Sequence, residues 1–580
     1  MKPLNTYYAN INFDLLNRIP LSAQNILEIG CGQGKLGAAF KDRQPLSRYF
    51  GVELMPAEAK IAATNLDGVV CANIELDHQI PKKFLTELNS EALFDALVLG
   101  DVLEHLQDPW RLLSEAHQWM APNSTCIICI PNVGHWSVVQ QLLKGRFDYA
   151  EAGLLDKTHL RFFTLETAVE MLSQVGWTVV EAIPRTFQPE KTQEALNAIM
   201  PIARSMNLNE SKLKRDLSAF QWVIRAVRGV VPAAMCVGAL GLKKFAGVTE
   251  ARVDYPLTAL NSLVSNRCVW GYGTISIPSD FKAGILILQR QFMNDAGFNT
   301  VMEKLIQDGW TLVADMDDDP HHWPQFVDSN FYAYRAVHAI TVSTTHLANM
   351  MNSWNPHVKV FPNAVMSLPF KSVDVAKETN RPIRVFFGAL NRKTDWQPIM
   401  SAICEVIVQL EGEIEFVVVH DKEFFDALPP ESRKTFHPTL NHANYMEVLS
   451  ACDVALLPLN DTPFNRCKSD IKLIECAAAG VAVICSKVVY AEDARHESFA
   501  KFATNPQEWR SALLHLAQNP NDLINRQNLG LEYSKKHRMH AHQVLERDAY
   551  YRGLIENRKQ LETDRQSRLK QLKLSVQAHS

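Results

Sequence analysis

The stretch Asn25-Ile-Leu-Glu-Ile-Gly-Cys-Gly-Gln-Gly34 decides the fold of the first part of the chain. A short apolar run leads directly into a glycine-rich turn, and a helical pattern follows the turn. The three glycines let the backbone turn tightly and approach a ligand closely, because they carry no Cβ. A second apolar run, Tyr49-Phe-Gly-Val-Glu53, ends in an acid. A glycine turn with an acid at the end of the next strand is how βαβ units hold a ribose, so the pair predicts nucleoside binding.

The residues of the turn favour one kind of nucleoside. The pattern is E-x-G-C-G-x-G, which differs from the G-x-G-x-x-G of pyrophosphate binders. Glu28 stands at the end of the first strand pattern, where its carboxylate would repel a pyrophosphate and attract a cation. The turn therefore predicts a cationic ligand with an amino-acid tail, such as a sulfonium compound.

This region resembles class I S-adenosylmethionine (SAM)-dependent methyltransferases. The resemblance continues through Ala72-Asn-Ile-Glu75 and through the strand and loop pattern from Phe94 to Leu106. It implies SAM as the cofactor, with Glu53 on the ribose hydroxyls and Asn73 near the adenine. The implied SAM-binding residues are Glu28, Gly30, Gly32, Gln33, Gly34, Glu53, Asn73 and Asp101, the last beside the methyl donor.

Length and composition indicate an ordinary globular protein of several domains. The chain has 580 residues, of which 47% are hydrophobic and 21% charged, and a single core rarely grows beyond about 250–300 residues. The net charge of −4 provides no basic field, which argues against a nucleic-acid partner. Eleven scattered cysteines indicate a reducing compartment, and Met1-Lys-Pro-Leu-Asn5 shows no signal-peptide pattern. We therefore expect a cytoplasmic location.

One apolar run raises the question of a membrane contact. Residues 229–242 are apolar, and four basic residues flank them: Arg225, Arg228, Lys243 and Lys244. The run is too short to span a bilayer, which takes about 20 residues. It is either a buried helix or loop, or a segment on an anionic surface that would make the protein peripheral at the inner membrane.

Strand and helix patterns divide the chain into five parts. Residues 1–187 predict an α/β domain with a doubly wound, Rossmann-like sheet, and residues 188–256 predict a helical connector with the membrane-surface option. Alternation returns in 257–365 and 366–545, which predict two Rossmann-like lobes, and the charged residues 546–580 predict an exposed helical tail. The predicted strands are 25–30, 48–53, 67–72, 94–100, 124–130, 177–183, 283–288, 311–314, 339–342, 358–361, 383–387, 414–419, 454–458 and 481–484.

A second chemistry is indicated between Asn465 and Gly480. Lys468 precedes a helical pattern that carries Glu475. A helix N-terminus beside a lysine suits a diphosphate, and Glu475 would bind ribose hydroxyls. The alternative is that both side chains only solvate and cap the helix. A further source of cations follows another strand pattern and comprises Gly388, Arg392 and Lys393.

The second half of the chain resembles GT-B glycosyltransferases of the large retaining, nucleotide-sugar-dependent class. The resemblance covers Pro362-Asn363 at the link between the lobes, Asp453 with Pro458, and the two cation segments. It implies a nucleotide sugar as the donor substrate, held by Gly388, Arg392, Lys393, Lys468 and Glu475. One position departs from the family, because many such enzymes carry a second Glu eight residues before Glu475 and this chain has Cys467. That departure leaves the contact to the transferred sugar open.

Asp315-Met-Asp-Asp-Asp319 looks like the D-x-D motif of the other glycosyltransferase fold. Clustered carboxylates suit Mn²⁺ or Mg²⁺, and Asp315, Asp317 and Asp318 would supply them. The helix of Glu475 is not expected in that fold. We therefore predict no metal, and interpret the segment as an acidic loop that offers Asp317 or Asp318 to the acceptor.

The segments Pro131–Trp136, Gly145–Tyr149 and Leu154–Thr164 resemble methyltransferases found in bacterial cell-surface polysaccharide clusters. An alcohol is a poor nucleophile until it is deprotonated, and imidazole titrates near neutral pH. A structural role is the alternative for each histidine, and alignment of nucleophile, methyl and sulfur can also suffice. The candidate catalytic residues are His159, His135 and His105 as bases, Asp156 to orient a partner, and Arg161 to anchor the acceptor.

Together these patterns predict a bifunctional methyltransferase and glycosyltransferase of bacterial surface polysaccharide biosynthesis, O-antigen or capsule-like. Its acceptor would be a glycan or a lipid-linked saccharide. One alternative, favoured by Cys467, is a small-molecule methyltransferase, acting for instance on a quinone precursor, whose second half binds a glycan without catalysis. The other is a non-catalytic scaffold of a polysaccharide assembly complex, which would not need the arrangement of Glu28 and Glu53.

Overall fold

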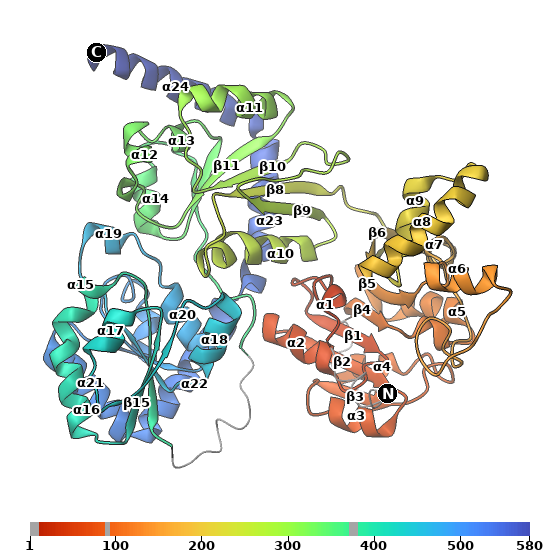
Figure 1. The fold of residues 1–580 in the computed structure, drawn as a ribbon, viewed down its shortest axis with the longest axis horizontal. Helices are drawn as coiled ribbons and strands as arrows, with labels where there is room; N and C mark the ends of the chain where they lie inside the picture. Colours follow the sequence, from red (N-terminus) through yellow and green to blue (C-terminus); the bar gives the residue numbers. More distant parts are fainter. Residues whose placement is uncertain (1–10, 88–92, 370–380, 580) are drawn as a thin grey trace. The chain divides into compact units, whose positions relative to one another are not determined.

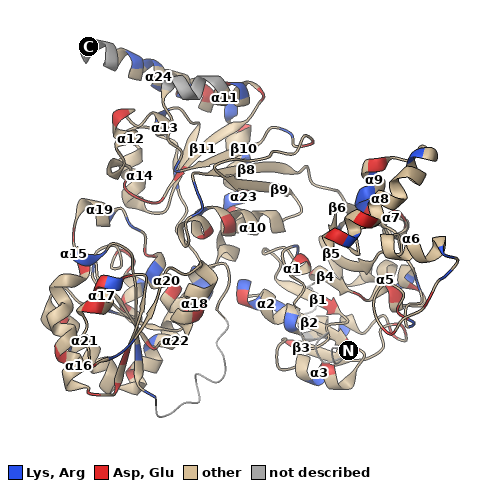
Figure 2. Cartoon of the chain, viewed as in Figure 1, with Lys and Arg blue, Asp and Glu red and all other residues tan. Residues whose placement is uncertain are grey.

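The computed structural model describes residues 11–87, 93–369 and 381–579 and separates into two compact units (Figure 1). The first unit comprises Met1–Ala234 and Asn261–Asn266, and the second comprises Met235–Leu260 and Arg267–Ser580. Met1–Asn5, for which no signal peptide was predicted, lies outside the described residues. Acidic and basic residues are interspersed along both units (Figure 2), in keeping with the small net charge.

A seven-stranded sheet forms the centre of the first unit, in the order β3-β2-β1-β4-β5-β7-β6. The first five strands pair in parallel, and β7 pairs antiparallel with both β5 and β6. The order reverses between β1 and β4, and ligands of open α/β sheets bind at the carboxyl ends of the strands at such a reversal. The strands are β1 (Asn25–Ile29), β2 (Arg48–Glu53), β3 (Gly68–Cys71), β4 (Phe94–Gly100), β5 (Met120–Pro131), β6 (Trp177–Arg185) and β7 (Gln221–Arg228).

Buried aliphatic and aromatic side chains of this sheet form one core with the helices that cover it. Leu27 and Ile29 of β1 and Leu97 and Leu99 of β4 are at most 2% exposed within that core. The helices of the unit are α1 (Phe13–Leu16), α2 (Lys35–Arg43), α3 (Pro56–Ala62), α4 (Pro81–Glu87), α5 (Pro109–Glu115), α6 (Trp136–Leu143), α7 (Leu165–Gln174), α8 (Pro189–Ser205) and α9 (Glu210–Ser218).

The second unit contains two lobes, each built on a six-stranded sheet. The first lobe has the order β13-β12-β11-β10-β8-β9, and the second has the order β16-β15-β14-β17-β18-β19, with parallel pairing throughout the second. The order of the second lobe is that of a doubly wound dinucleotide-binding sheet, and it reverses between β14 and β17.

The strands of the first lobe are β8 (Met235–Gly241), β9 (Asn266–Tyr272), β10 (Ile285–Gln289), β11 (Thr311–Met316), β12 (Ala339–Val342) and β13 (Val358–Val360). Those of the second are β14 (Ile383–Gly388), β15 (Ile414–Val419), β16 (Arg433–His437), β17 (Val454–Leu457), β18 (Ala482–Cys485) and β19 (Ala500–Phe502). The helices are α10 (Tyr255–Ser262), α11 (Asp295–Gln307), α12 (Pro324–Asp328), α13 (Tyr332–Arg335), α14 (Thr345–Met351), α15 (Lys393–Trp396), α16 (Met400–Gln409), α17 (Lys422–Ala427), α18 (His442–Ser450), α19 (Pro463–Arg466), α20 (Ile471–Ala478), α21 (Pro506–Gln518), α22 (Pro520–His537), α23 (His540–Glu556) and α24 (Arg558–His579).

The predicted strands are present, but the helical connector 188–256 differs from the prediction. Only its first part, α8 and α9, is helical, and β7 then completes the first sheet. The apolar run 229–242 contains β8, which is buried beside β10 in the first lobe. Half of that run, residues 235–241, is therefore a core strand that is not free to lie on a membrane, whereas Val230 and Val231 in the other half are exposed. None of the described helices is both long enough and apolar enough to cross a bilayer.

The C-terminal helix α24 was predicted to be exposed, and it is exposed on one face, while its other face packs on the first lobe. Arg565 is 1% exposed in its side chain and pairs with Glu303 of the first lobe at 3.0 Å. Arg568 donates to the carbonyl of Val337 at 2.7 Å, and Arg558 to that of Ile306. Long arginine side chains can bury their aliphatic stems while the guanidinium finds polar partners. A charged sequence therefore packs as part of the lobe.

Candidate functional site

The glycine turn and Glu53 meet at the carboxyl ends of β1 and β2. The Glu53 carboxylate accepts hydrogen bonds from the N–H of Gly32 at 2.8 Å and from the N–H of Met55 at 2.9 Å. Gly32 has a φ of 52°, in the left-handed region that favours glycine. A Cβ at Gly30 would lie 2.5 Å from a methyl carbon of Val102. The turn therefore holds an acid 5% exposed at the point where the strand order reverses.

Glu28 lies behind this turn as a buried carboxyl group. Its Oε2 accepts a hydrogen bond from the hydroxyl of Tyr49 at 3.1 Å. Burial raises the pKa of Glu28 to about 8, and the nearby Glu53 adds to the shift, while the bond from Tyr49 opposes it. The carboxyl is therefore largely protonated at neutral pH, and a cation beside it would favour its ionised form.

The other predicted SAM contacts surround the same edge of the sheet. Gly34 is the N-cap of α2, and the carbonyl of Gln33 accepts from the Asn65 amide at 2.8 Å. The Asn73 side chain accepts from the N–H of Glu75 in the turn after β3. Asp101 follows β4 with a φ of 54°, and its carboxylate accepts from Gln221 of β7. The loops after β1 to β4 thus bring all these residues to one edge.

Glu104, His105 and His159 form a group of titratable side chains beyond the end of β4. Glu104 was not among the residues predicted from the sequence. Glu104 is 1% exposed, and neither of its carboxylate oxygens has a hydrogen-bond partner within the described residues. Burial raises the pKa of Glu104, and Asp101 adds to the shift. The rings of His105 and His159 pack edge to face at 4.8 Å. An acid three residues after Asp101, beyond a buried strand, was the available signal.

These three side chains also lie close enough together that they could hold a metal ion. Ligand atoms of Glu104, His105 and His159 all lie within 4.8 Å of one another. Imidazole and carboxylate ligands suit zinc and other first-row divalent ions. This group, and not the Asp315 segment, is where the described residues could hold a metal.

The loop that carries His159 is anchored to this group by its backbone. The N–H groups of Leu160 and Arg161 donate to the carbonyl of Glu104 at 2.7 and 3.0 Å. The guanidinium of Arg161 donates to the carbonyl of Gln107, and Asp156 accepts from Thr158 within its own turn. Both side chains therefore have local structural partners.

His135 lies in a different environment from the other two histidines. It is the N-cap of α6, with Nδ1 2.8 Å from the Ser137 hydroxyl, and its ring contacts Trp136 and Phe220. Burial lowers its pKa to about 4, so it is neutral at pH 7. The structure brings His105 and His159 together and gives His135 a separate capping role.

In the second unit, Lys468 faces the acidic segment of the opposite lobe. Its ammonium group lies 2.7 Å from both carboxylate oxygens of Asp318 and over the ring of Phe464. Asp317 pairs with Arg290 at 2.8 Å, and Asp315 pairs with Arg252 at 2.6 Å. Three of the four carboxylates of the D-x-D-like segment are thus each paired with a lysine or arginine.

The predicted cations around Gly388 separate into two groups. Arg392 donates to Asn465 at 2.7 Å and lies near Phe464, the ring that also covers Lys468. Lys393 instead pairs on the surface with Glu423. A Cβ at Gly388 would lie 2.6 Å from the ring of Phe386, so the end of β14 is packed closely.

Cys467 is fully buried and belongs to an apolar cluster of the first lobe. Burial raises its pKa to about 12, so the thiol is neutral. Position 467 therefore carries no negative charge.

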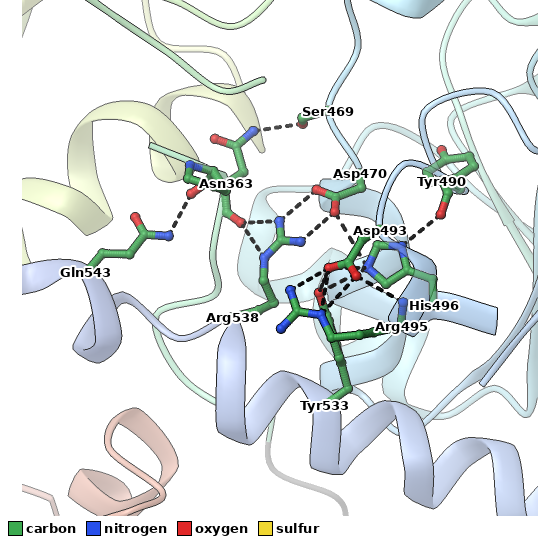
Figure 3. Close-up of polar contacts among 11 residues, drawn as sticks. Asn363, Ser469, Asp470, Tyr490, Asp493, Arg495, His496, Tyr533, Arg538 and Gln543 are labelled. Atoms are coloured by element: carbon green, nitrogen blue, oxygen red, sulfur yellow. Dashed lines mark hydrogen bonds and ion pairs between the residues drawn. The ribbon is translucent and has the colours of Figure 1, made fainter. Parts of the chain in front are cut away.

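The link between the lobes is held by a polar network around Asn363 (Figure 3). Its side chain accepts from Arg252 of the first lobe at 2.9 Å and donates to Ser469 of the second at 2.8 Å. Its carbonyl accepts from Arg538, which also holds the carboxylate of Asp470 in a two-pronged contact. The turn before α20 is therefore tied to the link and to the start of α23.

The comparison with known families gives a match within the first unit. Residues 4–182 match the family described as "Methyltransferase domain". This part of the chain is thus similar to methyltransferase domains. A ubiquinone biosynthesis O-methyltransferase of Xylella fastidiosa is 30% identical over 146 residues, which are 23% of this chain and 56% of that protein. One of Psychrobacter arcticus is 22% identical over 192 residues, which are 31% of this chain and 70% of that protein.

Solved structures are similar to this chain at low scores. Anabaena Alr3699/HepE in complex with UDP-glucose has 12% identity and a TM-score of 0.42, and it covers 55% of this chain and 100% of its own. The plantazolicin methyltransferase BpumL in complex with SAH has 17% identity and a TM-score of 0.25, and it covers 39% of this chain and 89% of its own.

The first prediction concerns the network at the link. Arg538→Ala would leave Asp470 without its buried partner, so we expect the second unit to lose about 3 kcal/mol of unfolding free energy. Arg466→Ala is the matched control, because Arg466 and Asp461 form a similar two-pronged pair that is exposed. Calorimetric unfolding should show a lower transition for the first variant and an unchanged one for the second. If both variants lowered the unfolding transition equally, the pair at the link would contribute no more to stability than an exposed pair.

Proposed function

We propose that the first unit is a SAM-dependent methyltransferase that methylates a hydroxyl group. The observation that carries this proposal is the Glu53 carboxylate, held by backbone N–H groups of Gly32 and Met55 beside the glycine turn. An acid in that place suits ribose hydroxyls. The match to the methyltransferase domain family supports the reaction class, and the names of the curated relatives support an oxygen acceptor.

SAM, when bound, supplies an electrophilic methyl group. The turn at Gly30, Gly32 and Gln33 would hold its methionine part, and Glu28 would neutralise the positive charge. Asp101, in a left-handed conformation after β4, would lie at the reacting end. These residues bind and orient the cofactor, which is most of what methyl transfer requires.

His159 is the base that we propose for the acceptor. Its Nδ1 lies 3.3 Å from the carbonyl of Leu154, and because a carbonyl only accepts, Nδ1 carries the hydrogen. Nε2 is then the basic nitrogen. Burial lowers the pKa of His159, so the ring is neutral and able to take a proton from a hydroxyl. His105 is in ring contact with His159 and would border the acceptor.

We propose that the second unit is a GT-B glycosyltransferase that uses a nucleotide sugar. The strand order of the second lobe, with Lys468 and Arg392 beside the reversal between β14 and β17, supports a nucleotide diphosphate site. Asp318 would leave Lys468 when a diphosphate arrives. The whole chain would then methylate and extend a bacterial surface glycan, with a glycan or lipid-linked saccharide as acceptor, in the cytoplasm.

A small-molecule methyltransferase is the second candidate function. The curated relatives are named for ubiquinone biosynthesis, and Cys467 offers no charge to a transferred sugar. In that case the acceptor is a hydroxylated ring compound, and the second unit binds a glycan without catalysis.

The second prediction tests the ribose contact. Glu53→Ala should weaken SAM binding about tenfold to a hundredfold, because a hydrogen bond to a charged acceptor contributes roughly 1.5–3 kcal/mol. Glu190→Ala, on the exposed start of α8, is the control and should bind normally. Isothermal titration measures both. Unchanged affinity of the Glu53 variant would exclude the ribose role.

The third prediction uses the titration of Glu28. Since its pKa is about 8 without ligand, a cation that lowers this pKa must release protons on binding at pH 7. The release should disappear above about pH 9, where the carboxyl is already ionised. Titrations of SAM in buffers with different ionisation enthalpies give the number of protons. Glu28→Gln should release fewer protons, and an unchanged number would assign the release to another group.

The fourth prediction separates the candidate functions. SAM and one of UDP, GDP or dTDP should each raise the unfolding temperature, since a ligand at 100 times its Kd stabilises by about 2.7 kcal/mol. Lys468→Ala should abolish the nucleotide shift and keep the SAM shift, whereas Lys422→Ala, an exposed lysine, should keep both. Stabilisation by SAM alone would favour the small-molecule methyltransferase, and by neither would favour the scaffold.

A further inference from the structure

A buried polar chain in the second unit runs from Glu475 through His442 to Tyr255. His442 Nε2 lies 2.8 Å from the carboxylate Oε1 of Glu475. His442 Nδ1 lies 2.9 Å from the hydroxyl of Tyr255. The His442 and Glu475 side chains are only 11% and 7% exposed. The three groups therefore act on one another with little competition from water.

The hydrogen bonds assign the tautomer of the histidine. A carboxylate only accepts, so Nε2 of His442 carries the hydrogen that points to Glu475. In the neutral ring, Nδ1 is then an acceptor and receives the Tyr255 hydroxyl. Tyr255 thus stabilises the tautomer that donates to Glu475, as second partners of a histidine commonly do.

Three separate elements bring these residues together. His442 is the first residue of α18, whose N-cap is Asn441, and Glu475 lies in the middle of α20. Tyr255 begins α10 in the first lobe, directly after a single π-helical turn, Glu250–Asp254. Such turns are rare and occur often at functional sites.

The polar chain formed by Tyr255, His442 and Glu475 borders a cavity of about 160 Å³. Glu475 has its second carboxylate oxygen, Oε2, without a hydrogen bond to the residues that the structure describes. A carboxylate with one oxygen held and the other unused suits a ligand that offers two neighbouring hydroxyl groups. The cavity is lined by Gly247, Ala251, Tyr255, Ala364, Val365, Met366, Ser367, Pro369, His442, Ala443, Met446, Ile471 and Glu475.

We propose that His442 is a positioning residue that directs Glu475 toward the two hydroxyls of a ribose, with Tyr255 holding the histidine in the required tautomer. The inference rests on the proposed nucleotide-sugar site and makes it selective for ribonucleotides over 2′-deoxyribonucleotides, so UDP or GDP, and not the deoxynucleotide dTDP, is the expected ligand. Loss of one hydroxyl removes one hydrogen bond to a buried, oriented carboxylate. The Tyr255 contact also connects this selection to the first lobe, because Tyr255 is the partner from that lobe.

The test compares each ribonucleotide with its deoxy form. Full-length protein is titrated with UDP, GDP and ADP and with the three 2′-deoxy diphosphates, and the affinity ratio is measured for the nucleotide that binds. The wild type should prefer the ribo form at least tenfold. His442→Ala should bring the ratio close to one. His442→Gln, whose amide nitrogen can still donate to Glu475, should retain most of the preference.

Two further variants distinguish positioning from general damage. Tyr255→Phe should reduce the ratio partially, because the histidine keeps its carboxylate partner but loses the bond that sets its tautomer. His515→Ala, on the exposed surface of the second lobe, should leave the ratio unchanged.

The outcomes separate this inference from the proposed function. If His442→Ala weakens the ribo and deoxy forms equally, the residue is merely structural and the inference is overturned, while the nucleotide site stands. If the wild type binds SAM but none of the nucleotides, the glycosyltransferase proposal fails, and the inference fails with it.

Discussion

Parallel pairing at a reversal of strand order is the constraint on which the rest of the structure depends. At the reversal, the connections that follow two neighbouring parallel strands run to opposite sides of the sheet. This leaves a crevice at the carboxyl ends of the two strands, where ligands bind. The reversal lies between β1 and β4 in the first unit and between β14 and β17 in the second lobe of the second unit. The glycine turn with Glu53 and the segment from Gly388 to Arg392 each follow a strand at such a place.

The two units treat buried charge differently. In the second, Asp315, Asp318 and Asp470 each meet a basic side chain, which offsets the desolvation of the carboxylates. In the first, Glu28 has only a tyrosine hydroxyl, and Glu104 has no hydrogen-bond partner within the described residues. An unpaired buried acid is costly and shifts toward its neutral form. A cationic ligand or a hydrogen-bond donor beside either of these two acids would offset the cost of burying its carboxyl group.

The link around Asn363 connects the two lobes of the second unit through hydrogen bonds. One amide side chain touches Arg252 of one lobe and Ser469 of the other, and one carbonyl touches Arg538. Ser469 and Asp470 belong to the turn that also carries Lys468. Lys468 therefore directly precedes in the chain two residues that are bonded to the link.

The sequence by itself determined most of the strands, the glycine turn, the acid at the end of β2 and the helix that carries Glu475, because these depend on local periodicity and on residues adjacent in the chain. Long-range pairing decided the rest. Residues 221–228 look like part of a polar connector until β5 and β6 offer them hydrogen bonds as β7. Arg565 looks exposed until Glu303, 262 residues away, provides a carboxylate. Glu104 with His159 and His442 with Tyr255 are likewise distant in the chain, so only tertiary structure could bring them together.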